Sequence, residues 1–451
     1  MSTTILTITA EVDPDRRERL NDELARLARS TDQSPHLPFS AIEELHFASL
    51  VVFDTPGFAS LLVLELNFDG ELAPLLDRLL DEASAELAQL FSCCRDFPSS
   101  DRATAPARDV FARYLLRHVV RPAAYHIGNV GRTQVRVAHE AALHSFLSQH
   151  IDRLQRNGWK PTSPRDVFTT IERELKSSAG FDWVRQGHET ETEEERSRPT
   201  FDIAAIGVSI AGALFAAWWV LSHWSGSRWS GAAWLLAGVV ILAAVIAVVL
   251  LRHEAMDAPM DPATLDAAHV HRLVACEDYL RVNHLASATV VKDGWFRRSL
   301  LRVVLFVANR LARLSTKGSL SGIPSIHYAH WSLVDGGRRL LFLSNYDGSW
   351  GSYLDDFVDK AAQGLTGIWS NTRGFPRTRM LITDGARDGA AFKAFARAQQ
   401  TPTAVWYVAA PYRDHALTVK RINANTELRR GLALGLHALS DDELSSWCRQ
   451  W

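Results

Sequence analysis

The chain has 451 residues, of which 22% are charged and 47% hydrophobic, so it has room for about three domains and is too apolar to be disordered throughout. The 49 lysines and arginines balance 51 aspartates and glutamates, and this balance indicates no nucleic-acid partner. The four cysteines, two of them adjacent at Cys93 and Cys94, form neither a disulfide framework nor a zinc spacing, which suits a reducing compartment.

The first 150 residues predict a ferredoxin-like unit. A short β-branched strand covers residues 4–11, and a charged amphipathic helix covers 16–29. Two alternating strands come next, followed by a helix over 72–91 with apolar residues at 3.6 spacing and a strand within 123–130. This order, β-α-β-β-α-β, is the split βαβ arrangement. We therefore expect an α+β domain over residues 1–150.

Two apolar runs follow a helical segment and acidic linker over residues 151–202. They cover 203–222 and 231–251, carry no charge, and have 20 and 21 residues. As helices, both are long enough to cross about 30 Å of hydrocarbon. Because only eight residues connect them, residues 203–251 are predicted to form a tight transmembrane hairpin. A buried helical hairpin inside a large soluble domain is the alternative.

Tryptophans and arginines predict how this hairpin sits in a lipid bilayer. Five of the 14 tryptophans fall within residues 218–234, near the hairpin tip, and indole rings prefer the headgroup layer. Arg196, Arg198 and Arg252 flank the outer ends, whereas the tip carries only Arg228. This asymmetry predicts an integral membrane protein with two spans and with both soluble halves in the cytoplasm.

The second half is predicted to form a second ferredoxin-like unit over residues 265–430. A linker over 252–264 precedes it, and a C-terminal tail over 431–451 follows it. Its main helices are expected over 296–314 and 353–369. Its strands outside the central pair are expected over 284–291, 379–383 and 404–409.

Short blocks of sequence recur in both halves, which predicts an internal duplication. The first block is Leu-His-Phe-Ala in one half and Ile-His-Tyr-Ala in the other, with an offset of 281 residues. The later blocks, Asn-x-Asp-Gly and Arg-x-Phe-Pro, have an offset of 278. A single three-residue deletion at a hairpin turn explains the change of offset. The blocks begin at Leu45 and Ile326, at Asn67 and Asn345, and at Arg95 and Arg373.

Two such units in one chain resemble the dimeric α+β barrel superfamily, which includes dye-decolorising peroxidases and chlorite dismutases. The resemblance is in the order of elements and in their duplication. It implies that the two units pair into one barrel-like body beneath the hairpin. Dye-decolorising peroxidases carry a Gly-x-x-Asp-Gly signature with a proximal His and a distal Asp and Arg around haem. In this chain Leu66 and Ser344 stand at the leading Gly of that signature.

The resemblance implies a haem site in the second half. Either His327 or His330 would be the axial ligand, and His327 is the residue expected to ligate the iron. Trp331 would help to cover the porphyrin. Asp347 would accept a proton while Arg373 stabilises charge. The residues themselves leave alternatives open. The histidines would form structural hydrogen bonds, Asp347 would cap a turn, and an Arg–Asp pair would join helix to strand.

Two functions remain from the sequence. The first is a membrane-anchored, haem-dependent, peroxidase-like oxidoreductase that acts on a lipophilic or membrane-near substrate. The alternative is a non-catalytic, membrane-anchored binding or assembly module that holds an apolar small molecule or protein partners, a second copy of the chain included.

Two further features stay open at this point. The helix over 295–314 combines a broad apolar face with five arginines. This composition fits a helix that lies on an anionic membrane surface and also fits a helix that packs on its own sheet, and one helix can do both. The pair His269 and His271 has metal-ligand character, but the sequence identifies no partner for it.

Overall fold

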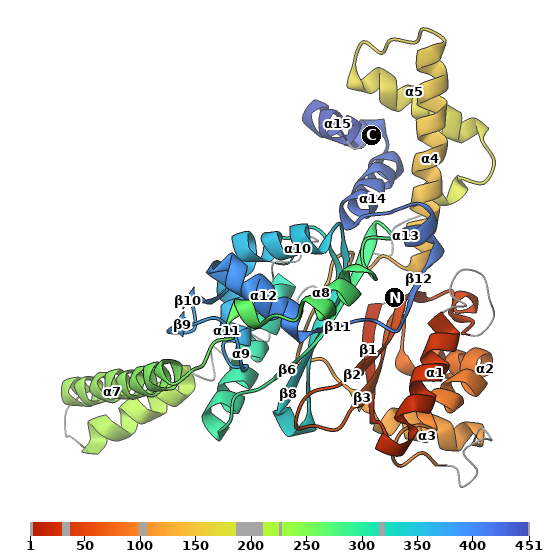
Figure 1. The fold of residues 1–451 in the computed structure, drawn as a ribbon. Coiled ribbons are helices and arrows are strands. Elements are labelled where there is room, and N and C mark those ends of the chain that lie inside the picture. Colours follow the sequence, from red (N-terminus) through yellow and green to blue (C-terminus); the bar gives the residue numbers. More distant parts are fainter. Residues whose placement is uncertain are drawn as a thin grey trace.

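Two five-stranded antiparallel sheets form the body of the protein (Figure 1). The computed structural model describes residues 3–28, 37–98, 106–185, 211–224, 228–314, 320 and 322–449. Apolar side chains from both sheets meet in one shared cluster, in which Val51 and Val63 of one sheet pack with Ala286 and Leu343 of the other. The sheets therefore face each other across a common core, and the expected α+β class is confirmed.

The first sheet has the strand order β12-β2-β3-β1-β4. Alternation along its central strand explains its two faces, because Leu62, Leu64 and Leu66 point to the covering helices while Val63 points to the other sheet. The strands are β1 (Thr3–Glu11), β2 (Leu45–Phe53), β3 (Leu61–Asp69), β4 (Val119–Val120) and β12 (Val405–Val408). The covering helices are α1 (Arg17–Ala28), α2 (Leu72–Phe91) and α3 (Arg108–Arg117).

The second sheet has the strand order β11-β6-β8-β7-β5. Its strands are β5 (Ala124–Ile127), β6 (Val282–Val290), β7 (Ile326–Val334), β8 (Arg339–Asp347) and β11 (Gln400–Thr401). Its covering helices are α9 (Trp295–Leu314), α10 (Trp350–Asp356), α11 (Ala362–Trp369) and α12 (Gly389–Gln399). A π-helical turn, Phe357–Ala361, joins α10 to α11, where the sequence predicts one continuous helix.

One outermost strand of each sheet is exchanged between the halves. β12, from the C-terminal half, pairs with β2, and β5, from the N-terminal half, pairs with β7. The expected strand within 123–130 thus completes the second sheet instead of the first. The expected strand over 379–383 joins neither sheet, because β9 (Thr378–Arg379) and β10 (Thr383–Asp384) pair only with each other. The physical reason is that a short strand pairs with whichever sheet edge its connection reaches.

The two sheets share a detail of register. β2 pairs with β3 with a shift between Leu45 and Phe47, and β7 pairs with β8 with a shift between Ile326 and Tyr328. Each shift is a β-bulge, which inserts one extra residue and redirects its side chain. The extra residues are the two repeated histidines, His46 and His327.

A separate helical cluster packs away from the sheets, at the top of Figure 1. It buries Leu143, Phe168, Leu428 and Trp447, and the Trp447 indole N–H donates to the Leu428 carbonyl at 2.9 Å. The expected C-terminal tail is therefore part of a packed core. The cluster consists of α4 (Gln134–Arg156), α5 (Pro164–Ser177), α14 (Val419–Leu434) and α15 (Asp441–Cys448). Two short helices, α8 (Ala267–Val274) and α13 (Ala410–Asp414), belong to the body instead.

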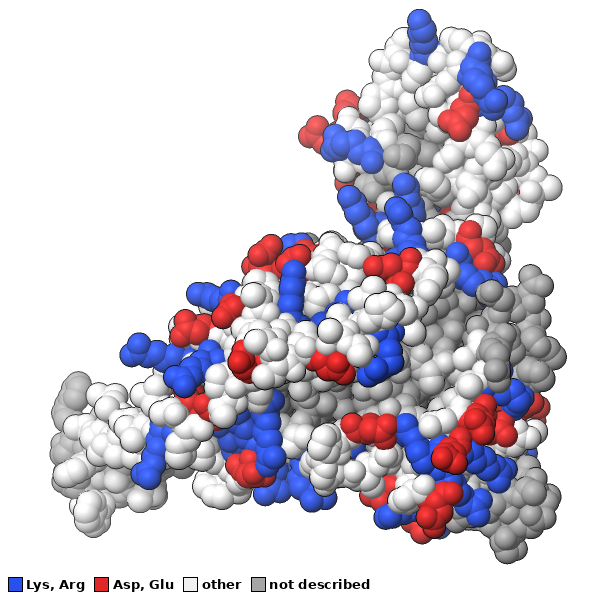
Figure 2. Space-filling view, in the orientation of Figure 1, with Lys and Arg blue, Asp and Glu red and all other residues white. Residues whose placement is uncertain are grey.

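The apolar helix α7 (Arg228–Ala255) projects from the body (Figure 1). Its residues Gly231–Ala255 are long and apolar enough to cross a membrane, and only 6% of the apolar window is buried. The projecting region is largely free of charged side chains in Figure 2. Residues 203–210 of the first expected span lie outside the described residues, and 211–224 are helical. One candidate span is therefore present, and the expected two-span hairpin is not shown.

Candidate functional site

The predicted ligand His327 is bonded to the predicted proton acceptor Asp347. The ring Nε2 lies 2.7 Å from Asp347 Oδ1, and the other carboxylate oxygen accepts the backbone N–H of Val419 at 2.8 Å. Val419 is the first residue of α14. A carboxylate at a helix N-terminus satisfies an otherwise unpaired N–H group and favours the helix dipole. The pair therefore joins the bulge of β7 to the start of α14.

His46 and Asp69 have the same arrangement in the first half. His46 Nε2 lies 3.0 Å from Asp69 Oδ1, and Asp69 Oδ2 accepts the backbone N–H of Gln134, the first residue of α4, at 2.7 Å. His46 Nδ1 lies 2.5 Å from the Tyr412 hydroxyl. Burial, with Asp69 and Asp347 nearby, raises the pKa of Tyr412 well above its usual value, so the hydroxyl stays protonated and donates to the ring. These histidines serve as structural links.

The expected haem ligand does not fit this geometry. The Nε2 atom of His327 is taken by Asp347, and the ring packs against Phe47 and Tyr412 with centroids 5.5 Å and 5.2 Å away. The side chain is 1% exposed. A porphyrin needs one free ring nitrogen and an open face beside it. At His327, Nε2 is bonded to Asp347 and aromatic rings cover the buried side chain, so the surroundings of this residue do not fit a haem.

Arg373 does not reach Asp347. Its backbone N–H donates to the carbonyl of Val290, whereas Asp347 pairs with Val282 at the other end of β6. At ~3.3 Å per residue, these positions lie about 26 Å apart along the strand. The Arg373 side chain instead forms an ion pair with the exposed Asp293. The structure therefore does not bring Asp347 and Arg373 together, because the helix that precedes Arg373 returns the chain to the opposite end of the sheet.

His330 belongs to a buried polar cluster between the two sheets. Its centre is Glu65 of β3, whose Oε2 lies 2.9 Å from Nε2 of His284 and whose Oε1 lies 3.6 Å from Nδ1 of His330. The other nitrogen of His330 lies 2.9 Å from the Thr7 hydroxyl. Ser49 also donates to Glu65, at 2.9 Å. The carboxylate thus connects strands of both sheets.

Electrostatics hold Glu65 ionised in this cluster. Burial raises its pKa, but the hydrogen bond and charge of His284, the charge of His330 and the hydrogen bond from Asn67 outweigh burial and lower the pKa to about 2. Burial lowers the pKa of His330, and Glu65 opposes that effect. Glu65 and His284 were not among the residues selected from the sequence. The available signal was a lone acid in the apolar strand Leu-Leu-Val-Leu-Glu-Leu.

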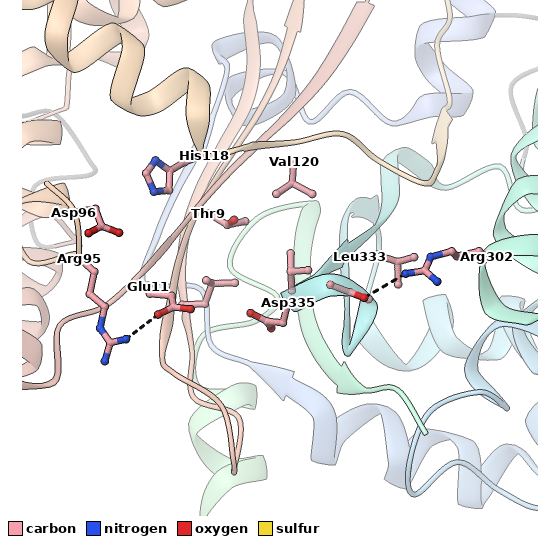
Figure 3. A pocket seen from close by; sticks show the side chains of 13 residues that line it. Thr9, Glu11, Arg95, Asp96, His118, Val120, Arg302, Leu333 and Asp335 are labelled. Atoms are coloured by element: carbon pink, nitrogen blue, oxygen red, sulfur yellow. Dashed lines mark hydrogen bonds and ion pairs between the residues drawn. The ribbon is translucent and has the colours of Figure 1, made fainter. Parts of the chain in front are cut away.

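A mixed-charge cleft of about 630 Å³ lies at one end of the two sheets (Figure 3). Glu11 and Arg95 pair on one wall at 3.1 Å. On the other wall, Arg302 donates to the carbonyl of Gly336 at 3.2 Å, and Asp335 pairs with Arg339. The charged side chains that line the cleft are of both signs, and two of the carboxylates, Glu11 and Asp335, are paired with arginines.

An apolar cavity of about 670 Å³ lies on the outer side of the second sheet. It is formed mainly by α9, α11 and β5, and none of its lining residues is charged. Trp331, one of the residues predicted from the sequence, lines this cavity. The wall includes Val303, Val307, Leu311, Leu365, Ile368 and Ile382. A cavity of this size and character suits a lipophilic small molecule.

The end of α7 holds one wall of this cavity. Glu254, on the last turn of α7, accepts from the Thr378 hydroxyl at 3.0 Å and from the backbone N–H groups of Met380 and Leu381 at 2.8 and 2.9 Å. Leu381 and its neighbour Ile382 line the cavity. The wall is therefore attached directly to the helix that could cross a membrane.

A second carboxylate attaches α9 to the same region. Asp257, just after α7, lies 2.7 Å from the guanidinium of Arg297 and 2.6 Å from the ammonium of Lys292. Arg297 is 1% exposed, and burial lowers the pKa of Lys292. The first turn of α9 is thereby held beside the end of α7. Both sides of the cavity are thus fixed to α7.

The comparisons provide no relative from which a function could be transferred. The chain matches no family model, and no curated protein or solved structure is similar to it. Among the described residues, no group of three or more His, Cys, Asp or Glu side chains is arranged to hold a metal ion. His269 lies within 3.1 Å of the Arg397 carbonyl and so packs α8 against α12. The candidate site is therefore the apolar cavity.

Proposed function

We propose that the protein is a membrane-anchored binding module whose apolar cavity takes a lipophilic molecule from the bilayer. The observation that carries this proposal is the position of an uncharged cavity between α9 and the turn held by Glu254, both fixed to the end of α7. A molecule dissolved in the bilayer would reach this cavity without crossing water.

The outer face of α9 supports entry from a membrane. Val303, Val307 and Leu311 all line the cavity, and their side chains are 58, 46 and 57% exposed. Exposed apolar side chains in a contiguous group indicate an interaction surface. Because they lie beside the base of an apolar projecting helix, the bilayer is the occupant that this surface fits best.

The finer features of the anchor belong to the same proposal. Residues 203–251 form a hairpin of two spans, with both soluble halves on the cytoplasmic side. The equal strand orders, the exchanged strands and the matching bulges support an origin of the two halves by duplication of a ferredoxin-like unit. A dimeric α+β barrel relationship explains these features, but it carries no activity to this chain.

The haem-dependent, peroxidase-like oxidoreductase stays a prediction that we do not adopt. Its expected axial ligand His327 is bonded to Asp347, and Arg373 lies at the other end of β6. His330 contributes to the cluster around Glu65. We therefore propose the binding module instead of the oxidoreductase.

Photolabelling of the full chain in lipid nanodiscs tests the proposal. An uncharged aryl diazirine, activated by light, should label peptides from α9 and α11 as well as α7. Gly364→Phe places a ring in the cavity, where a β-carbon would meet no atom within 4 Å, and should remove most label from α11 while leaving that on α7. Gly351→Phe, at another helical glycine with open space but outside the cavity, is the matched control. Labelling confined to α7 would overturn the proposal.

A further inference from the structure

One face of α9 packs on the second sheet, and the other face is exposed and mostly apolar. Leu301 and Leu305 are 0% exposed and belong to the core of the second sheet. On the other side of the helix, Trp295, Phe306 and Leu311 are 75, 42 and 57% exposed. Packing on the sheet therefore accounts for only one side of α9. A contiguous group of exposed apolar side chains indicates a partner for the other side.

Arginines border this exposed face. The sequence of α9 contains five arginines and no acidic residue. Arg297 is buried in an ion pair and so belongs to the fold. Arg298 and Arg302 lie four residues apart on one edge of the exposed face, and their guanidinium groups donate to the carbonyls of Gly294 and Gly336. Neither of the two forms an ion pair with another described residue. Cations beside exposed apolar side chains fit a surface that offers both hydrocarbon and negative charge.

A second segment beside the cavity has the same character. The exposed Arg379 precedes Met380 and Ile382, which are 40 and 52% exposed. This segment is bonded to the last turn of α7. His253 of the same turn stacks on Phe296 of α9, with ring centroids 5.0 Å apart. Both cationic segments therefore lie at the base of α7, where Figure 2 shows lysine and arginine side chains on the body.

Little negative charge offsets these arginines. The segments concerned are residues 252–257, 295–314 and 377–384. Of their acidic groups, Glu254 holds the backbone of the turn, and Asp257 is paired with two cations. Asp384, at the end of β10, is exposed and has no ion pair within the described part of the chain. Arg298, Arg302 and Arg379 outnumber it, so the surface carries net positive charge.

We infer that Arg298, Arg302 and Arg379 bind the phosphates of anionic phospholipids, so that α9 lies in the headgroup layer of the membrane. This inference rests on the proposed function, because α7 must bring the surface to the bilayer. A helix with exposed apolar side chains and arginines binds anionic membranes in this way. Each arginine near such a membrane strengthens binding about fivefold. The position places Val303 and Val307, at the cavity wall, where headgroups meet acyl chains.

Quenching of a fluorophore at position 299 tests the lipid preference. Ser299 is exposed and precedes Val303 and Phe306 by four and seven residues, so it shares their face. The full chain carries Ser299→Cys with the native cysteines replaced, and it is held in phosphatidylcholine nanodiscs with a trace of nitroxide-labelled lipid. The two quenchers have the same acyl chains and either a phosphatidylglycerol or a phosphatidylcholine headgroup. Phosphatidylglycerol should bind at least about fivefold more strongly near the fluorophore. High salt should reduce this preference.

Two triple variants separate the proposed surface from net charge. Replacement of the three binding arginines by glutamine should reduce the preference to less than about twofold. The matched control replaces three exposed arginines of the separate helical cluster by glutamine and should keep the preference. The test variant is Arg298→Gln/Arg302→Gln/Arg379→Gln, and the control is Arg153→Gln/Arg156→Gln/Arg173→Gln. The salt measurement needs no substitution in the surface, so it remains decisive if the test variant does not fold.

The outcomes separate this inference from the proposed function. Equal quenching by the two headgroups would overturn the anionic preference and leave the apolar binding module in place. A preference that persists in the test variant, or that high salt does not change, would also overturn the inference. Quenching by neither lipid would show that α9 does not reach the bilayer. The proposed function is decided independently, by whether the aryl diazirine labels α11.

Discussion

Glu65 of β3 and His284 of β6 meet across the interface of the two sheets, with Oε2 and Nε2 2.9 Å apart. Both side chains are nearly inaccessible to solvent, at 0 and 2%. A buried carboxylate is tolerated only when hydrogen bonds and opposite charge replace water. The pair therefore positions the two sheets relative to each other, and this relative position in turn supports the strands that form the cavity.

Replacement of this carboxylate should be strongly destabilising. Glu65→Ala leaves His284 and His330 without their buried partner, so we expect a loss of about 3 kcal/mol or more in the free energy of unfolding. Chemical unfolding of the detergent-solubilised full chain measures this loss. Glu11→Ala is the control, because Glu11 is exposed and its pair with Arg95 should contribute less than about 1 kcal/mol. Equal losses in the two variants would contradict the buried pair.

The Glu65 contribution should depend on pH in a definite direction. The pKa of Glu65 is about 2 in the folded protein against 4.5 for the ordinary group, so folding favours the ionised carboxylate. Its stabilisation is therefore present above pH 4.5 and is lost as the pH falls toward 2. Unfolding curves at several pH values should converge for the unaltered protein and Glu65→Ala near pH 2. A constant difference across this range would be inconsistent with the assignment.

His126 should make the protein less stable in mild acid. Burial lowers the pKa of His126 from 6.5 to about 4, so the unfolded chain binds a proton that the folded chain excludes between these values. Stability therefore falls as the pH drops from 6.5 to 4, by about 3 kcal/mol from this group. His126→Phe should abolish that part of the pH dependence, whereas the exposed His415→Phe should retain it. The free energies of unfolding of the unaltered protein and the two variants, measured at pH 7 and pH 4.5, test this prediction.

Glu254 should control the order of the turn at the cavity wall. Met380 and Leu381 have φ values of 57° and 63°, in the left-handed region that side chains other than glycine disfavour. The carboxylate of Glu254 holds both backbone N–H groups there. Glu254→Ala should therefore raise hydrogen exchange at these two amides at least tenfold, with little change in β7. Asp261→Ala, at an exposed 3₁₀-helix cap nearby, is the control and should leave both amides protected.

Membrane topology can be tested directly. With the native cysteines replaced, a cysteine at Ser227 should react with an impermeant maleimide added to intact cells, and a cysteine at Ser34 should react only after lysis. The protein should also stay with membranes in a carbonate wash. Release into the wash would argue against spanning helices, and labelling at position 34 from outside would reverse the orientation.

Local pattern determined most of the secondary structure. The helix predicted over 72–91 has those bounds in α2, and the helix over 296–314 differs from α9 by one residue. The apolar span within 231–251 is helical as expected. These elements could be predicted because apolar spacing along a short segment decides which face is buried, whatever the segment later packs against.

Tertiary structure alone decided the site. His284 and Glu65 are separated by 219 residues, and nothing near either residue in the sequence indicates the other. The exchange of β5 and β12 between sheets depends on which edge each connection reaches, so the same local pattern fits either sheet. The cavity exists because α9, α11 and β5 leave a space between them that Trp331 does not fill. Packing over such distances depends on the whole arrangement of elements, whereas a sequence pattern reports only the neighbours of each residue.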